Sequence, residues 1–458
     1  MRFLTRLAVI LVLLGVAGAV ALAAIIFWPA RRTPPVTTLP ADWKPAPGAG
    51  EAVARAADCI ACHTTPGGAP YAGGFRIDSP FGAIYSSNIT PDRETGIGGY
   101  TLDEFRAALY DGVRQDGRRL YPAMPYVNYR KLSEEDVRAL YDYFMNGVKP
   151  VSHTPKRTEL AFPFNQRWGL RLWQSVALPR AGFTPHRGDA TLDRGAYLVE
   201  ALGHCGACHS PRNALFMESG LDANDPDFLS GGQLGDWPIP DLRAADMPTQ
   251  TWPASELAAF LRTGRNAETG AAGEMSLTIG HSLQYLPQAD LDALIAYLRA
   301  IRQDRAAPAV AARRREPQPT ARRLTAAVDL TLGERLYLDN CNACHFADGR
   351  GARATFPALD GNPLVTAASP GGIISMILGG ASMPSTRERP LALVMPGFAW
   401  RLNDDEVAAL ATFVRQGWSN AASAVTVADV APVRARLRAA QAATAGTLHN
   451  GPENGEGR

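Results

Sequence analysis

The chain has no cysteine to spare for a disulfide bond. Among its 458 residues are six cysteines, and all six belong to three copies of one spacing, Cys-x-x-Cys-His. Histidine is scarce as well: the chain has eight, and one directly follows each cysteine pair. This arrangement leaves neither a structural disulfide nor a free reactive thiol. The three copies are Cys59-Ile-Ala-Cys62-His63, Cys205-Gly-Ala-Cys208-His209 and Cys341-Asn-Ala-Cys344-His345.

The chain also lacks a strong charge of either sign. Its formal net charge is +2, so no whole-molecule field indicates a nucleic-acid partner. Apolar residues make up 46% of the chain and charged residues 20%, which is typical of globular proteins. A length of 458 residues predicts about three domains of ordinary size.

One long apolar run stands at the N-terminus. Residues 7–28 carry no charged side chain and, as a helix rising about 1.5 Å per residue, would span a hydrocarbon core of about 30 Å. A cleaved signal peptide is the alternative, because Ala19-Val20-Ala21 fits the small-residue cleavage pattern. The run continues to Trp28, an aromatic residue at interface depth, which favours a retained membrane anchor. Both interpretations export the rest of the chain.

Beyond the N-terminus the chain repeats one pattern three times. Each Cys-x-x-Cys-His motif ends a short helical stretch, and each repeat closes with a second amphipathic helix. Ser133 and Asn403 are predicted to cap two of these closing helices. Gly195 and Gly333, each followed by an aromatic residue in the same helix, suit close helix–helix contact. The closing helices are predicted at residues 132–144, 286–298 and 402–414.

We therefore expect a mainly α fold with three tandem copies of one small helical domain after an N-terminal transmembrane or signal helix. The connection between the first two domains holds an aromatic-rich stretch, which we expect to pack across their faces rather than on a membrane. The predicted divisions are 1–30 (anchor or signal), 31–48 (extended proline-rich tether), 49–150 (domain 1), 151–191 (connection), 192–303 (domain 2), 304–326 (solvated Arg- and Pro-rich linker), 327–421 (domain 3) and 422–458 (a tail without periodicity).

The triple motif carries the chemistry. C-x-x-C-H is the attachment signature of c-type haem: the two cysteines bind the porphyrin vinyl groups as thioethers, and the histidine ligates iron. Structural zinc is one alternative, but it needs four ligands and each motif supplies three. Thiol–disulfide exchange is another, but a redox C-x-x-C normally follows a strand of a βαβ unit. The sequence thus predicts three covalently bound haem c groups, one in each of three tandem class I cytochrome c domains, and no catalytic residues of its own.

The sixth iron ligand is predicted to be methionine at each haem, because a thioether raises the potential and suits electron transfer. Met124, Met275 and Met395 precede the closing helices of their repeats by the fewest residues. The competitors Met247 and Met383 lie farther from these helices in the sequence. His281 could replace Met275, and His204 is a further candidate. The glycine-bearing segment 73–92 lacks the strand–turn–helix context of a nucleotide loop, and we expect it to wrap a haem edge.

Residues 49–420 resemble the three-haem cytochrome c subunit of bacterial membrane-bound sugar, alcohol and polyol dehydrogenases. The resemblance rests on the triple motif and on Ser-Asn-Ile-Thr-Pro-Asp at 87–92, Leu-Tyr-Pro-Ala-Met-Pro-Tyr at 120–126, His-Ser-Leu-Gln-Tyr-Leu at 281–286 and Met-Pro-Gly-Phe-Ala-Trp at 395–400. It implies that Met124, Met275 and Met395 are the axial methionines.

The resemblance also implies a setting. Such subunits accept electrons from a catalytic dehydrogenase subunit, which is a flavoprotein or a pyrroloquinoline-quinone (PQQ) protein, and a small third subunit accompanies some. They pass electrons to ubiquinone at the periplasmic face of the bacterial inner membrane. Two rivals stay open: a multihaem peroxidase, which needs an open haem position and acid/base residues beside it, and a freestanding carrier to a terminal oxidase.

Overall fold

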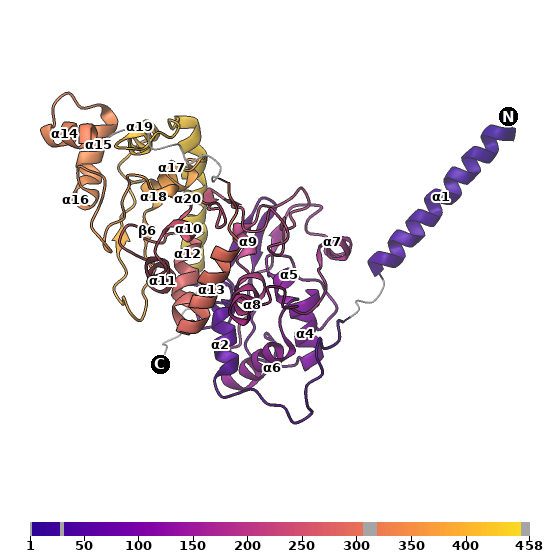
Figure 1. The fold of residues 1–458 in the computed structure, drawn as a ribbon. Helices are drawn as coiled ribbons and strands as arrows, with labels where there is room; N and C mark the ends of the chain where they lie inside the picture. The colour runs from indigo at the N-terminus through magenta and orange to yellow at the C-terminus, as the bar shows by residue number, and fades with distance from the viewer. Residues whose placement is uncertain (1, 28–31, 306–317, 450–458) are drawn as a thin grey trace, which may run out of the picture. The chain divides into compact units, whose positions relative to one another are not determined.

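The computed structural model describes residues 2–27, 32–305 and 318–449. The chain is mainly helical, as predicted, and its strands are short (Figure 1). It divides into two compact units, and the division runs through the predicted second domain. Unit 1 comprises Met1–Ala207, Arg212–Asp225 and Tyr285–Tyr297, and unit 2 comprises Cys208–Pro211, Pro226–Gln284 and Leu298–Arg458. The three-domain division stays a prediction.

Residues 7–27 of the apolar N-terminal run belong to helix α1 (Arg2–Phe27), and Trp28 lies outside the described residues. Within residues 2–27, 32–305 and 318–449, no helix combines the length and the apolarity needed to cross a membrane.

Unit 1 contains the first motif and a small antiparallel sheet. Strand β1 (Arg76–Ser79) pairs with β2 (Gly82–Tyr85), and β2 pairs with β3 (Glu159–Leu160). Strands β1 and β2 lie within segment 73–92, and the expectation that this segment wraps a haem edge stays a prediction. The helices are α2 (Ala49–Ala56), α3 (Cys59–His63), α4 (Leu102–Asp111), α5 (Tyr126–Tyr129), α6 (Glu134–Asp142), α7 (Gly169–Ala177) and α8 (Ala190–Tyr197), with π-helical turns η1 (Tyr143–Gly147) and η2 (Leu198–Leu202).

Unit 2 contains the third motif and a large apolar core. Two short hairpins belong to it, β4 (Gly232–Leu234) with β5 (Trp237–Ile239) and β6 (Ala381–Ser382) with β7 (Val394–Met395). Its helices are α10 (Pro248–Thr251), α11 (Ala254–Thr263), α12 (Glu274–His281), α14 (Gln318–Ala326), α15 (Leu332–Asn340), α16 (Asn342–His345), α17 (Pro363–Thr366), α18 (Gly371–Gly379), α19 (Asp404–Gln416) and α20 (Val427–His449). Helices α9 (Gly206–His209) and α13 (Gln288–Ala300) and the 3-10 turn η3 (Leu283–Tyr285) extend across the division.

The close helix contact predicted at Gly195 and Gly333 is confirmed. A methyl group added at Gly195 of α8 would lie 2.1 Å from the carbonyl oxygen of Ala293 in α13, and one at Gly333 of α15 would lie 2.4 Å from that of Ala409 in α19. Gly50 of α2 repeats the contact, at 2.1 Å from the carbonyl oxygen of Ala139 in α6. Each of the three helices that precede a motif therefore crosses a closing helix at a glycine. The predicted caps Ser133 and Asn403 are also confirmed.

Two segments expected to be irregular are helical. Residues 318–326, assigned to the solvated linker, form α14, whose Leu324 is buried in the core of unit 2. The tail forms α20, which buries Val430 and Val433 in the same core. Both expectations fail because a few apolar residues suffice to bury one face of a helix, even among arginines and alanines. Residues 306–317 and 450–458 lie outside the described residues.

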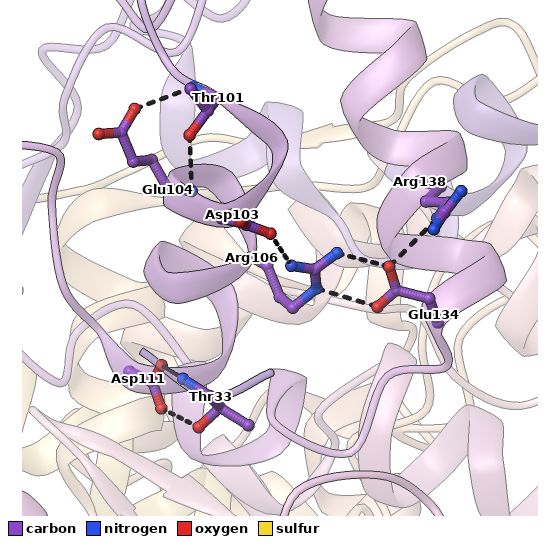
Figure 2. A network of polar contacts seen from close by, with 8 residues as sticks. All are labelled: Thr33, Thr101, Asp103, Glu104, Arg106, Asp111, Glu134 and Arg138. Carbon is purple, nitrogen blue, oxygen red and sulfur yellow. Dashed lines mark hydrogen bonds and ion pairs between the residues drawn. The ribbon is translucent and has the colours of Figure 1, made fainter. Parts of the chain in front are cut away.

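The start of the tether is packed rather than free. The backbone N–H and the Oγ1 hydroxyl of Thr33 donate to the Asp111 carboxylate at 2.7 and 2.6 Å (Figure 2). Arg32 pairs with Glu104 at 3.4 Å. The carboxylates of α4 thus bind this end of the tether, which composition alone did not indicate.

The aromatic connection packs in part within unit 1. Phe164 stacks on Phe81 with ring centroids 3.9 Å apart, and the indole N–H of Trp173 donates to the carbonyl oxygen of Leu215 at 2.8 Å. Phe162 is 79% exposed, so only some of the aromatic side chains are covered.

Candidate haem-binding sites

The three motif histidines share one hydrogen-bond arrangement. Each lies at the end of a short helix, α3, α9 or α16, and its Nδ1 faces a backbone carbonyl oxygen. Because a carbonyl can only accept, Nδ1 carries the proton, and Nε2 keeps its lone pair for a metal. The pairs are His63 with Ser87 at 2.7 Å, His209 with Pro240 at 3.0 Å and His345 with Pro357 at 2.8 Å.

Burial keeps these imidazoles neutral. It lowers the pKa of all three motif histidines, although the hydrogen bond to the carbonyl acts in the opposite direction. Neutral imidazole with a free Nε2 is the form that binds iron. The histidines thus fit an axial ligand to haem.

The backbone after each of the three motifs returns to the motif histidine through a glycine. The carbonyl oxygen of each motif histidine accepts a hydrogen bond from a glycine N–H that has a positive φ. These glycines are Gly73 (2.8 Å, φ 76°), Gly231 (2.7 Å, φ 86°) and Gly351 (3.2 Å, φ 60°). Other residues rarely adopt that conformation, so a glycine is needed where the chain turns back toward the motif.

The first cysteine of the first motif and that of the third motif have surroundings that favour the thiol over the thiolate. Burial, followed by the neighbouring Asp58 carboxylate, raises the pKa of Cys59 to about 12. Burial, followed by Cys344, raises the pKa of Cys341 to about 12. Zinc binding and thiol–disulfide exchange both need the thiolate, which these surroundings disfavour. Thioether attachment of haem does not need it in the finished protein.

The predicted axial methionines are all partly buried. Met124 precedes α5, Met275 lies in the first turn of α12, and Met395 ends β7. Met395 packs against the core that contains Cys341, so the structure brings these two predicted site residues to the same cluster. The competitor Met383 lies beside Gly270, where an added methyl group would be 2.2 Å from the methionine methyl group. The assignment of all three axial methionines stays a prediction.

The remaining histidine candidates have other surroundings. The His204 ring bonds to the carbonyl oxygen of Ala57, and burial lowers its pKa although that bond acts to raise it. His281 ends α12 and is exposed.

Comparison with known proteins agrees with this geometry. The cytochrome c family model matches residues 330–418, which contain the third motif. The gluconate 2-dehydrogenase cytochrome c subunit of Pantoea cypripedii is 42% identical over 394 residues, covering 84% of this chain and 88% of the relative. The chain belongs to the family of dehydrogenase cytochrome c subunits.

Two further members are similar along most of their length. The cytochrome c subunit of the alcohol dehydrogenase (quinone) of Gluconobacter oxydans (strain 621H) is 39% identical, covering 84% of this chain and 81% of the relative, and the fructose dehydrogenase cytochrome subunit of Gluconobacter japonicus is 38% identical, covering 88% and 86%.

For this dehydrogenase cytochrome subunit the resemblance noted from sequence is confirmed, and haem c is its cofactor. Sequence reasoning missed the carbonyl acceptors Ser87, Pro240 and Pro357. They lie 24, 31 and 12 residues after their histidines, so no fixed spacing marked them.

Proposed function

We propose that the chain carries three covalently bound haem c groups and passes electrons from a catalytic dehydrogenase subunit to ubiquinone. The observation that carries the proposal is the threefold arrangement of a motif histidine, a carbonyl acceptor for its Nδ1 and a glycine that returns the chain to the motif. The family membership supports the same function.

The chain's own residues hold and orient the cofactor. His63, His209 and His345 would each present Nε2 to iron, and the carbonyl acceptors would fix the ring and raise its basicity as a ligand. The cysteine pairs would form the thioether links, and Met124, Met275 and Met395 would supply the sixth ligands. Bound haem supplies reversible one-electron redox chemistry.

The partner and the acceptor are inferred from the relatives. They are named as subunits of gluconate, alcohol and fructose dehydrogenases, so substrate chemistry varies while the cytochrome subunit is kept. We infer that a separate flavoprotein or PQQ subunit oxidises the substrate for this chain. The quinone in one relative's name supports a quinone as the electron acceptor. We infer that this acceptor is ubiquinone at the periplasmic face of the inner membrane, as the resemblance of the sequence implies.

The test is purification of the full chain from a detergent extract of cells that produce it. A co-purifying large subunit with flavin or PQQ is expected, and substrate should reduce the haems, which a short-chain ubiquinone should reoxidise. Haems that are reduced by no partner would contradict the proposal and favour a freestanding carrier. Turnover of hydrogen peroxide by the isolated chain would contradict it in favour of a peroxidase.

A further inference from the structure

One backbone carbonyl in unit 1 links the segments that lead into the first and second haem attachment motifs. Ala57, two residues before Cys59, caps the C-terminal end of α2 and is 1% exposed. Its carbonyl oxygen accepts a hydrogen bond from the Tyr129 hydroxyl at 2.6 Å and bonds to the His204 ring. His204 is the residue directly before Cys205. Residues at the entrance to both motifs therefore share one acceptor.

The two side chains that meet there also contact each other. The rings of Tyr129 and His204 pack edge to face with centroids 5.5 Å apart. Tyr129 is 5% exposed, and its surroundings include the Cys59 and Cys62 thiols. It belongs to α5, which begins two residues after the predicted axial ligand Met124. Tyr129 thus touches the first site and the approach to the second.

The backbone on both sides of this contact is strained. His204 has φ 39° and Asp58, directly before Cys59, has φ 51°. Residues other than glycine keep such left-handed conformations only where their surroundings hold them, and these conformations concentrate at functional sites. The hydrogen bond to Ala57 is one contact that holds His204.

A set of buried polar contacts braces the same region. The Lys131 ammonium lies 3.3 Å from the Glu200 carboxylate and donates to the carbonyl oxygen of Leu221 at 2.6 Å. The Ser133 N–H donates to the Tyr197 hydroxyl at 3.1 Å. These contacts bind the segment after α5 to α8 and η2, which lead into the second motif. Several elements of unit 1 therefore hold the segment that leads into the second motif.

We propose that His204 and Tyr129 are positioning residues that hold the first and second motifs together, so that electrons pass directly between the first and second haems at this junction. The inference rests on the proposed function. The step moves one electron from reduced iron at one motif to oxidised iron at the other, and no atom or proton is transferred. His204 therefore acts as a brace between two sites rather than as the iron ligand considered from sequence.

The test measures electron redistribution in the full haem-loaded chain after a reducing pulse. His204→Phe removes the hydrogen bond and Tyr129→Phe removes one hydroxyl, and His204→Gln keeps a donor. We expect one redistribution phase to slow several-fold in His204→Phe and Tyr129→Phe and to stay near the native rate in His204→Gln. Asn340→Ala is the matched control, because Asn340 directly precedes the third motif and its amide donates locally, to Leu336 at 2.7 Å.

Haem content separates failure of this inference from failure of the proposed function. Fewer than three haems per native chain would contradict the proposed function. If His204→Phe and Tyr129→Phe keep three haems and every phase of electron redistribution keeps its native rate, the proposed role of these two residues is wrong. Equal slowing in Asn340→Ala would also contradict it. If His204→Phe loses haem, Tyr129→Phe decides, because it removes a single oxygen atom.

Discussion

The Nδ1 of His345 donates a hydrogen bond to the carbonyl oxygen of Pro357 across 2.8 Å. The bond selects one tautomer and orients the ring, so Nε2 is the atom left for iron. His63 and His209 make the same bond to carbonyls in unrelated stretches of sequence. Backbone carbonyls therefore orient the histidine ligands. Substituting the side chains of the acceptor residues should leave these hydrogen bonds largely intact.

Removing one motif should remove one haem. The double substitution Cys341→Ala with Cys344→Ala leaves two complete motifs, so we expect the ratio of haem to polypeptide to fall from three to two. A pyridine haemochrome assay with quantitative protein determination measures it. A substitution in the connecting sequence, Asn342→Ala, keeps both thiols and should keep three haems. An unchanged ratio in the double variant would show that the third motif does not attach haem.

Replacing a predicted axial methionine should lower one haem potential. Met395→His exchanges a thioether for an imidazole, which stabilises oxidised iron relative to reduced iron. Potentiometric titration should show one haem shifted downward and the weak sulfur-to-iron band diminished. Met376→Leu, which changes a partly buried methionine of α18, is the control and should leave all potentials in place. If Met395→His does the same, another residue ligates the third iron.

The cofactor and the helix pairs could be predicted from sequence, but the second shell of the sites could not. Covalent attachment of haem requires two cysteines and a histidine at fixed spacing, so a five-residue motif is enough to identify each attachment site. The contacts of Gly195 and Gly333 could be predicted because an aromatic residue follows each glycine in the same helix, whereas α2 has no aromatic residue after Gly50. The acceptors Ser87, Pro240 and Pro357 arise only after loops of different lengths fold back, and no local pattern encodes that.

The Arg106–Glu134 pair should be essential to the stability of unit 1. Figure 2 shows Arg106 of α4 directed at Glu134 of α6, with bonds of 2.9 and 2.6 Å and both side chains almost completely buried. Arg106→Met leaves a carboxylate buried with Arg138 at 3.2 Å as its remaining cation, and we expect a loss of about 3–5 kcal/mol in the free energy of unfolding. Chemical denaturation measures it. Arg118→Met, which removes an exposed partner of Asp116, should cost no more than about 1 kcal/mol.

The double variant Arg106→Met with Glu134→Leu separates charge from packing. It removes both charges, so it should recover much of the stability lost in Arg106→Met. No recovery would mean that Arg106 acts through its shape rather than through the ion pair.

The helix crossings should not tolerate a methyl group. Gly333→Ala would place one 2.4 Å from the Ala409 carbonyl oxygen and 2.8 Å from the Phe413 Cβ, so α15 and α19 must move apart. We expect a loss of roughly 1–3 kcal/mol, and the same for Gly50→Ala and Gly195→Ala. Gly169→Ala is the matched control, because nothing lies within 4 Å of a methyl group added there in α7. Denaturation midpoints equal to that of the control would show that the helices yield without cost.

The stability of unit 2 should depend on pH through Glu334. The Glu334 carboxylate accepts from the Thr331 N–H and hydroxyl, both at 2.9 Å, and from Nε and Nη2 of Arg323 at 2.6 and 2.5 Å. Burial acts to raise the pKa of Glu334, but these bonds prevail and lower it from its ordinary value of 4.5. The folded state therefore holds the ionised form better than the unfolded state does. Its contribution is complete above pH 4.5 and is lost as the pH falls through the lowered pKa.

Glu334→Gln tests this sign directly. At neutral pH we expect the variant to be less stable than the native chain by about 1–2 kcal/mol, a modest figure because Arg323 is half exposed. The difference should shrink on acidification below pH 4.5, since the native carboxylate then becomes neutral as well. Glu94→Gln, which removes an exposed carboxylate, should follow the native curve throughout. A difference between native and Glu334→Gln that stays constant during acidification would mean that Glu334 stabilises α15 through its shape and not through its charge.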